Sequence, residues 1–346
     1  MRPDVRTPYH PGVKAIVQDR YGSPDVLTVA DVAEPLATGN RIVVRVLAAS
    51  INARDWHVMR GDPYLARPTI GWKRPRVAAL GTDFACRVES VGPDVTRFRP
   101  GDEVFGEADA AFAEFVMVPE DLVERKPPGL TYEQAAAIPL AGSTALMGLR
   151  DVAHVMPGQR VLINGASGGV GTFAVQLGKW LGAEVDGVCS ARNADLVASL
   201  GADRVIDYAR EDFTAGAPAY DVVFDLVGNR SLTHLRRALA PSGTLVLSGG
   251  GTSKAAGRGA KAGGVSFVGP MGLIIGGLAS SLVVRRPRIA VLTAKPSGAN
   301  LATLRDLAES GKLVPAVDRN FAFADIAEAI RYMEVEHPRA KVTITF

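Results

Sequence analysis

The sequence of 346 residues has little cysteine and little excess charge. Its two cysteines, Cys86 and Cys189, lie far apart without metal-type spacing, which argues against a disulfide framework and indicates a reducing compartment, the cytoplasm. The formal net charge is only +3, and Lys and Arg are dispersed except at Arg285, Arg286 and Arg288. We therefore expect no nucleic-acid partner. The length allows two domains, each with its own buried core.

Long hydrophobic runs are scarce as well. The first twelve residues, MRPDVRTPYHPG, contain no apolar core and do not predict a secretory signal. Residues 267–284 are nearly free of charge, but Pro270 and several glycines interrupt them, and their length is at the lower limit for a membrane span. We interpret this stretch as buried or lid-like, with interfacial membrane contact as the alternative. The Gly-rich stretch before it, residues 249–264, is expected to be mobile.

The chain does contain a strong nucleotide-binding pattern at residues 160–192, RVLINGASGGVGTFAVQLGKWLGAEVDGVCSAR. The pattern predicts a strand at 160–164, a helix at 172–181 and a second strand at 184–189. Gly165, Gly168 and Gly171 bracket the turn after the first strand. Glycines let a phosphate approach the main chain, and the N-terminus of the next helix stabilises its charge. In this β-α-β context the glycines predict a dinucleotide site, rather than merely a tight turn.

The end of the second strand lacks the acidic residue that would bind the ribose 2′-hydroxyl of NADH. Ser190 stands there, with Arg192 two residues later, and Asp186 lies too early in the strand. A hydroxyl and a guanidinium suit a 2′-phosphate, and Tyr208 would add a phenolic donor. NADPH is therefore the expected cofactor. The alternative for Arg192 is a solvated cation on a loop.

The residues before about 120 predict an all-β barrel or sandwich. Its expected strands lie near residues 14–18, 27–31, 41–49, 81–92, 98–105 and 111–118. Residues 50–61 are expected to form a loop entering a short helix, capped by Asn52 or Asp55.

Two helices are expected to follow. Thr131 and Gln134 form a capping box for a helix at 131–137, Pro139 interrupts it, and residues 143–152 continue as another helix.

From residue 160 onward strands and helices alternate, which indicates a doubly wound parallel sheet in an α/β fold. Helices are expected at 196–200, 232–239 and 301–310, and strands at 204–208, 221–226 and 244–248. A helix at 325–336 and the final strand, KVTITF, are expected to return and complete the β domain; alternatively they cap the parallel sheet.

The chain resembles the medium-chain dehydrogenase/reductase superfamily, and within it the zinc-independent quinone oxidoreductase branch. The motifs that carry the resemblance are KAIVQDRYGSPDVL, ASINARDWHVMRG, RFRPGDEVFG, AAAIPLAGSTAL, INGASGGVGTFAVQLGK, VCSARN and LGADRVIDY. The resemblance implies a GroES-like β domain formed by residues 1–130 and 315–346, and a Rossmann cofactor domain formed by residues 131–314. It also implies a homodimer.

Zinc-dependent members of this superfamily place a Cys after the third strand and a Gly-His-Glu further on. This chain has Asn52 to Asp55 in the first place and Gly81-Thr82-Asp83 in the second, and it lacks the four-Cys lobe. His57 without Cys or Glu partners is more typical of a structural residue. We therefore expect no metal.

The resemblance also assigns the cofactor contacts. Ser167, Gly168, Gly169 and Val170 are expected to bind the pyrophosphate; Ser190, Arg192 and Tyr208 the 2′-phosphate end; and Thr144, Gly228 and Lys295 the nicotinamide half. Relatives often carry Asn where this chain has Leu226, which puts one ribose contact in doubt.

Without a metal, hydride delivery to an activated acceptor remains feasible, because a quinone or an α,β-unsaturated carbonyl spreads the arriving charge onto oxygen. Asn52 is the first candidate to polarise the acceptor or hold the ribose; the alternative is a turn or cap residue. Asp55 would orient water or a ribose hydroxyl. Tyr64 is a candidate proton donor, unless it packs beneath the loop.

These residues together predict a zinc-independent, NADPH-dependent reductase of a small quinone or enone. Two alternatives remain: a reductase dedicated to one biosynthetic enone, and a non-catalytic NADPH-binding protein.

Overall fold

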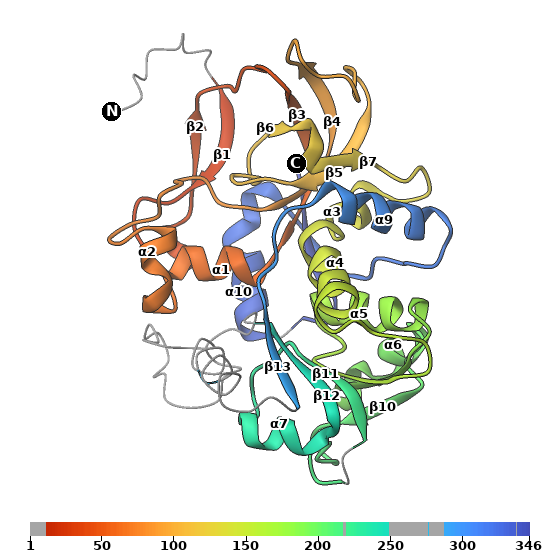
Figure 1. The fold of residues 1–346 in the computed structure, drawn as a ribbon. Coiled ribbons are helices and arrows are strands. Elements are labelled where there is room, and N and C mark those ends of the chain that lie inside the picture. Colours follow the sequence, from red (N-terminus) through yellow and green to blue (C-terminus); the bar gives the residue numbers. More distant parts are fainter. Residues whose placement is uncertain (1–11, 217–218, 249–275, 277–286, 337) are drawn as a thin grey trace.

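The computed structural model describes residues 12–216, 219–248, 276, 287–336 and 338–346. Two large sheets dominate the described chain, a mostly antiparallel one in the upper half of Figure 1 and a parallel one in the lower half. The predictions for residues 249–264 and, apart from Gly276, for 267–284 lie outside the described residues.

The upper sheet has seven strands, in the order β14-β15-β3-β4-β5-β7, with β6 also paired to β3. Their bounds are β3 Arg41–Ile51, β4 Asp83–Val91, β5 Glu103–Glu107, β6 Phe115–Pro119, β7 Val123–Arg125, β14 Val317–Ala322 and β15 Lys341–Thr345. A separate two-stranded sheet joins β1 Val13–Val17 to β2 Thr28–Val32.

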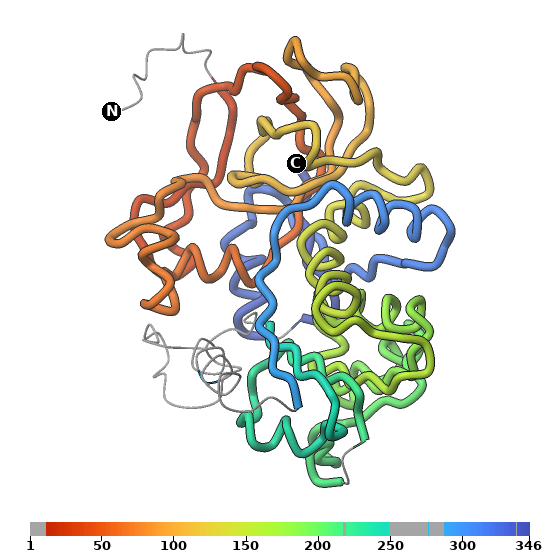
Figure 2. Tube along the Cα trace, viewed as in Figure 1, coloured from red at the N-terminus to blue at the C-terminus, as the bar shows by residue number. Residues whose placement is uncertain are grey.

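The C-terminal chain returns to this sheet, as the sequence predicted. Strand β15 pairs antiparallel with β3, with Thr343 opposite Ser50, and β14 pairs with β15. In Figure 2 the blue end of the chain runs back into the red and orange part of the molecule. The expectation that the tail completes the β domain is therefore confirmed.

The lower sheet has six parallel strands in the order β10-β9-β8-β11-β12-β13, which is the doubly wound order of dinucleotide-binding folds. Their bounds are β8 Arg160–Asn164, β9 Glu184–Cys189, β10 Arg204–Asp207, β11 Tyr220–Asp225, β12 Leu239–Ser248 and β13 Arg288–Leu292. The sequence predicted all but β13.

Strand β8 shows why this sheet needs helices on both faces. Val161 and Ile163 belong to one apolar core, whereas Leu162 between them belongs to another. All three are fully buried, and successive side chains of a strand point to opposite faces of the sheet. Both faces must therefore be covered.

Helices cover both sides of the parallel sheet (Figure 1). Residues of α4, α5, α6 and α9 share the core of Val161, and residues of α7 share the core of Leu162. The helix bounds are α1 Ala53–Arg60, α2 Arg67–Ile70, α3 Tyr132–Ala136, α4 Pro139–Leu146, α5 Gly169–Trp180, α6 Ala194–Ser199, α7 Leu232–Ala238, α9 Gly298–Glu309 and α10 Ile326–Val335.

Three predicted helix starts were wrong, and that of α9 is one of them, because it begins at Gly298 rather than Leu301. Helix α4 begins at Pro139 rather than Ser143, because proline is well suited to the first position of a helix, where its missing N–H has no intrahelical partner. Helix α5 begins at Gly169, inside the glycine turn, rather than at Thr172. The capping box of Thr131 and Gln134 at the start of α3 is confirmed.

Candidate cofactor and acceptor site

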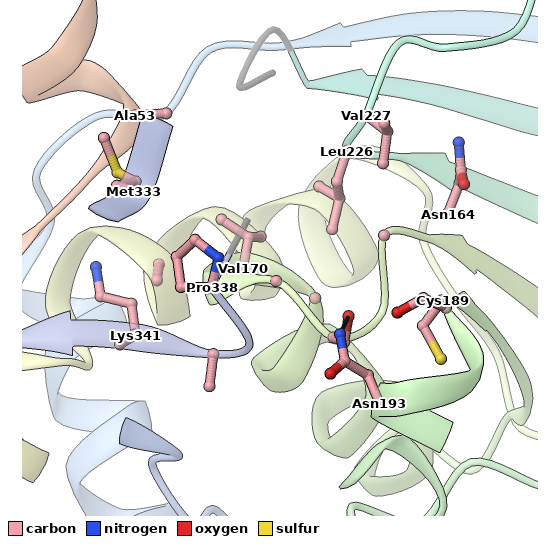
Figure 3. Close-up of a pocket in the computed structure, with 18 of the residues that line it drawn as sticks. Ala53, Asn164, Val170, Cys189, Asn193, Leu226, Val227, Met333, Pro338 and Lys341 are labelled. Atoms are coloured by element: carbon pink, nitrogen blue, oxygen red, sulfur yellow. Dashed lines mark hydrogen bonds between the residues drawn. The ribbon is translucent and has the colours of Figure 1, made fainter. Parts of the chain in front are cut away.

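A cavity of about 850 Å³ lies between the two sheets. It is bordered by the carboxyl ends of β8, β9 and β11, by the β3–α1 junction and by the C-terminal segment. Because β9, β8 and β11 are neighbours in the sheet, the cavity opens where the strand order reverses, the usual ligand position in doubly wound folds. Figure 3 shows the cavity with Lys341 and Met333 on one side and Asn193 and Cys189 on the other.

The glycine turn forms the floor of the cavity. Gly165 has φ of +91°, a conformation that favours glycine, and a Cβ atom on Gly171 would lie 2.1 Å from the Gly165 carbonyl oxygen. The turn is therefore too tight for side chains at these positions. Ser167, Gly168, Gly169 and Val170 all line the cavity, and the N-terminus of the 12-residue helix α5 begins among them. Such a cradle fits the pyrophosphate of a dinucleotide.

The end of the cavity opposite Lys341, called the far end, is formed by residues that come after strand β9. Ser190, Arg192 and Tyr208 line it together, as the sequence predicted for a common subsite. The Arg192 guanidinium also donates to the Glu336 carbonyl oxygen at 2.8 Å, which joins this end to the C-terminal segment. Asp186 is absent from the lining residues: it is buried and accepts a 2.6 Å hydrogen bond from the Tyr220 hydroxyl.

Asn193 fixes the contact between this end and the glycine turn. Its amide donates to the Ser167 hydroxyl at 3.0 Å, and both residues line the cavity. The sequence reasoning did not select Asn193, because an Asn after a strand is common in turns.

Asn52 lies on the opposite wall, where β3 ends and α1 begins. Its Oδ1 accepts from the Lys341 ammonium at 2.6 Å, and its Nδ2 donates to Asp83 Oδ2 at 2.9 Å. Both ends of the amide are thus engaged by buried charged groups, which fixes its orientation. Asn52 is also the N-cap residue of α1. The capping alternative therefore applies to it, and it is compatible with a role of the side chain in the cavity.

Asp83 is fully buried behind Asn52 and Lys341 and does not line the cavity. Its carboxylate accepts from the Ser50 hydroxyl at 3.0 Å and from the Leu140 amide at the start of α4 at 3.1 Å, and Lys341 Nζ lies 3.6 Å away. Burial raises the pKa of Asp83, whereas Lys341, Asn52 and Ser50 favour the charged form. The sequence analysis considered Asp83 only because zinc-dependent relatives have a different residue at this position.

Asp55 supports the wall from behind and does not line the cavity. Its Oδ2 accepts from the Asn52 backbone amide at 2.8 Å and its Oδ1 from the Thr82 hydroxyl at 3.0 Å. Burial raises the pKa of Asp55 to about 6. Asp55 therefore positions Asn52 and Thr82 in this structure and does not face a ligand.

Four other predicted site residues also lie outside the cavity lining. Tyr64 packs edge-on against Trp72, with the Arg67 guanidinium 4.6 Å from its ring centre. Thr144 donates to the Leu140 carbonyl oxygen at 2.6 Å within α4. The Gly228 amide donates to Asp225 at 3.1 Å, and Lys295 is exposed.

Strand β11 supplies a polar group that the sequence reasoning missed. Leu226 lines the cavity, and so does Asn229 three residues later. The Asn164 amide donates to Asn229 Oδ1 at 3.0 Å and to Asp225 Oδ1 at 2.8 Å. The segment after β11 thus lines the cavity with an apolar side chain, Leu226, and an amide, Asn229.

Known proteins share this arrangement. The family model described as "Alcohol dehydrogenase GroES-like domain" matches residues 38–128, and the one described as "Zinc-binding dehydrogenase" matches residues 200–344. The chain is 32% identical to mouse "NAD(P)H oxidoreductase RTN4IP1, mitochondrial", over 95% of this chain and 88% of the relative.

Several solved structures are also similar to this chain. The quinone oxidoreductase from Coxiella burnetii superimposes with a TM-score of 0.79 at 29% identity, covering 96% of this chain and 99% of that one. Mycobacterial Rv1454c, solved in complex with NADPH, gives a TM-score of 0.76 at 26% identity, covering 97% of this chain and all of that one.

The fold and the cavity define an oxidoreductase that uses a nicotinamide cofactor. The chain belongs to the medium-chain dehydrogenase/reductase superfamily, in its quinone oxidoreductase branch. The resemblance predicted from the sequence motifs is confirmed, as is the fold of a Rossmann sheet with a GroES-like domain.

Two further observations concern only the described residues. Among them no cluster of three or more His, Cys, Asp or Glu side chains could bind a metal ion. Within the same ranges, no helix combines the length and the apolar character needed to cross a membrane.

Proposed function

We propose that the protein is an NADPH-dependent reductase of quinones or α,β-unsaturated carbonyl compounds. The observation that carries the proposal is the composition of the cavity's two ends. One end joins a hydroxyl, a guanidinium and a phenol, with no acidic residue directly after β9, and the other presents Lys341 and Asn52 with Asp83 buried behind them.

The cationic character of the far end supports NADPH. A second hollow of about 540 Å³ shares Arg192 with the main cavity and is also lined by Arg319 and Arg339. The same hollow contains Asp318, which forms an ion pair with Arg339 at 3.4 Å, and Glu336. Arginine binds phosphate through paired N–H donors, whereas a carboxylate would repel it. The NADPH complex of the mycobacterial relative supports the same cofactor.

The glycine turn and the helix behind it would hold the pyrophosphate, and Asn229 with Asn164 would face the nicotinamide ribose. When bound, the cofactor supplies a hydride. This chain's own residues would position the reactants, and Ala53, Val170, Leu226 and Met333 contribute apolar side chains to the lining of the cavity.

The acceptor oxygen that gains negative charge needs a hydrogen-bond donor or a cation of the protein to stabilise it. The buried cluster around Asn52 and Lys341 is the polar part of the wall opposite the adenosine end. We propose that a flat quinone or enone binds beside this cluster. Oxidation of an unactivated alcohol would need a group that stabilises the alkoxide, such as a zinc ion. This chain has Asn52 and Thr82 at positions where zinc-dependent relatives have zinc ligands.

Stopped-flow absorbance at 340 nm with a panel of quinones and enones tests the proposal, with NADPH and NADH compared for each acceptor. We expect oxidation of NADPH by at least one acceptor class, and a higher kcat/KM with NADPH than with NADH. Activity confined to one complex enone would favour a dedicated biosynthetic reductase. Tight NADPH binding without oxidation by any acceptor would contradict the proposal and favour a non-catalytic protein.

We further propose that the protein is a homodimer acting on a small molecule in the cytoplasm. Analytical ultracentrifugation of the full chain tests the assembly, and a monomer at micromolar concentration would contradict it.

A further inference from the structure

We propose that Lys341 is a catalytic residue whose ammonium binds the oxygen atom of the acceptor on which negative charge develops during reduction. This inference rests on the proposed function, because it assigns a role in the same reaction. The sequence reasoning selected no residue of the last strand for the site.

The position of Lys341 is unusual for a lysine. It is the first residue of β15, its side chain is 3% exposed, and it lines the cavity. A Cβ atom placed on Gly169 would lie 3.0 Å from Lys341 Cδ, so the stem passes directly beside the phosphate turn. Figure 3 shows the side chain on the wall opposite Asn193, the adenosine side. A buried lysine is costly unless its charge is used or paired.

The Lys341 ammonium has three N–H donors, and two of them form hydrogen bonds with the protein. Nζ donates to the Ile51 carbonyl oxygen at 3.1 Å and to Asn52 Oδ1 at 2.6 Å. Asp83 Oδ2 is 3.6 Å away, beyond hydrogen-bond distance. Since an ammonium carries three protons, the third can turn to a ligand in the cavity while Asp83 still compensates its charge.

Asn52 cannot replace Lys341 in this role. Its Oδ1 already accepts from Lys341, and its Nδ2 donates to Asp83 and to the Ser50 carbonyl oxygen at 3.4 Å, so its polar atoms are oriented towards the protein. Among the described residues that line the cavity, Lys341 and Arg192 are the cationic side chains, and Arg192 belongs to the end after β9. Lys341 is therefore the positive group on the acceptor side.

The chemistry balances without a metal. The hydride from NADPH goes to the β carbon of an enone, forming a C–H bond, or to one oxygen of a quinone, forming an O–H bond, while a C–H bond of the cofactor breaks; the acceptor is reduced and the cofactor is oxidised. The π electrons of the acceptor move to its carbonyl oxygen, or to the second oxygen of the quinone, giving an enolate or a hydroquinone monoanion. The Lys341 ammonium hydrogen-bonds to this oxyanion, and water supplies the proton that completes the product.

Three variants test the proposal: Lys341→Met removes the charge at similar length, Lys341→Arg keeps it, and Lys126→Met is the matched control. Lys126 is also a buried lysine, paired with Glu103 at 3.3 Å, and it does not line the cavity. Circular dichroism and thermal unfolding establish that each variant is folded. Single-turnover rates at saturating NADPH and the Kd for NADPH are then measured for each.

We expect Lys341→Met to slow single turnover about a hundredfold, the usual loss for one oxyanion donor, with the Kd for NADPH changed less than about threefold. Lys341→Arg should recover part of the rate, and Lys126→Met should leave it unchanged. A Lys341→Met variant that binds NADPH at least tenfold more weakly but turns over at the wild-type rate would overturn the proposal, because Lys341 would then bind the cofactor phosphates.

A second readout does not depend on turnover. 4-Nitrophenol added to the complex with NADP⁺, below the pKa of free nitrophenol, should bind as the yellow phenolate in the wild type and in Lys341→Arg, but not in Lys341→Met. Absence of phenolate in the wild-type complex would also overturn the proposal. Phenolate binding that needs Lys341, in a chain inactive with every acceptor, would refute the proposed function and support the oxyanion site.

Discussion

The Nζ atom of Lys341 lies 2.6 Å from Oδ1 of Asn52, although 289 positions separate the two residues in the chain. The contact exists because β15 pairs with β3 and brings the last strand of the chain beside the end of the third. It also brings the C-terminal segment to the glycine turn, where the Ala340 amide donates to the Ser167 carbonyl oxygen at 2.6 Å. The cavity is therefore completed by the tail.

The first prediction concerns cofactor choice. Arg192→Ala should weaken NADPH at least tenfold while changing the Kd for NADH little, because a charge-assisted contact to the 2′-phosphate is worth about 1.5–3 kcal/mol. Fluorescence titration with each cofactor measures the two Kd values.

Arg210→Ala is the control for this prediction. Arg210 lies two residues after Tyr208, its side chain is 86% exposed, and it is paired with Asp207 rather than facing the cavity. It should change neither Kd. Equal weakening of NADPH and NADH by Arg192→Ala would refute the assignment of Arg192 to the 2′-phosphate.

The second prediction concerns Glu107, a buried carboxyl opposite Asp83 in the β4–β5 pair. Burial, followed by the charge of Asp83, raises its pKa to about 8. The folded protein therefore holds a proton that the unfolded chain releases above about pH 4.5, so this group's contribution to stability is lost as pH rises towards 8.

Glu107→Gln removes that titration. Relative to the wild type, its free energy of unfolding should rise by on the order of 2–4 kcal/mol between pH 5 and pH 8.5, since one pKa unit corresponds to about 1.4 kcal/mol. Urea unfolding at the two pH values measures the change. Glu89→Gln, at a half-exposed position paired with Arg45, is the control for the loss of one carboxylate. An identical pH profile for wild type and Glu107→Gln would show that Glu107 is not protonated in the fold.

Much of the cofactor end could be predicted because its signals are local. The glycine turn, Ser190, Arg192 and Tyr208 follow strands directly, and parallel strands bring their carboxyl ends to one edge. The same reasoning predicted every strand of the parallel sheet except β13. The domain limits near residues 130 and 315 stay a prediction.

The acceptor end was harder, because its contacts join distant segments. Lys341 begins an otherwise uncharged segment, KVTITF, and a charged residue at the end of a strand normally faces solvent. Only the pairing of β15 with β3 buries it against Asn52. Asp55 and Tyr64 were selected as polar groups on the β-domain side of the expected cleft, but the backbone of α1 and the packing around Trp72 direct them elsewhere.

The third prediction follows from that placement of Tyr64. Tyr64→Phe should keep kcat and KM within about twofold, because Tyr64 does not line the cavity and phenylalanine retains the ring that packs against Trp72 and Arg67. Steady-state kinetics with the best acceptor measures both constants. A loss of kcat above tenfold, with KM for NADPH unchanged, would restore Tyr64 as a proton donor.

The fourth prediction concerns the close packing of the glycine turn. A methyl group on Gly171 would lie 2.1 Å from the Gly165 carbonyl oxygen, so Gly171→Ala must displace the turn or the start of α5. We expect a loss of stability of about 1–3 kcal/mol and weaker NADPH binding, because overpacking forces backbone shifts. Urea unfolding and cofactor titration measure the two effects. Gly129→Ala is the matched control, since a Cβ atom there meets nothing within 4 Å, and it should leave both quantities unchanged. If the two variants behave alike, the turn is not constrained by the contact between Gly165 and Gly171.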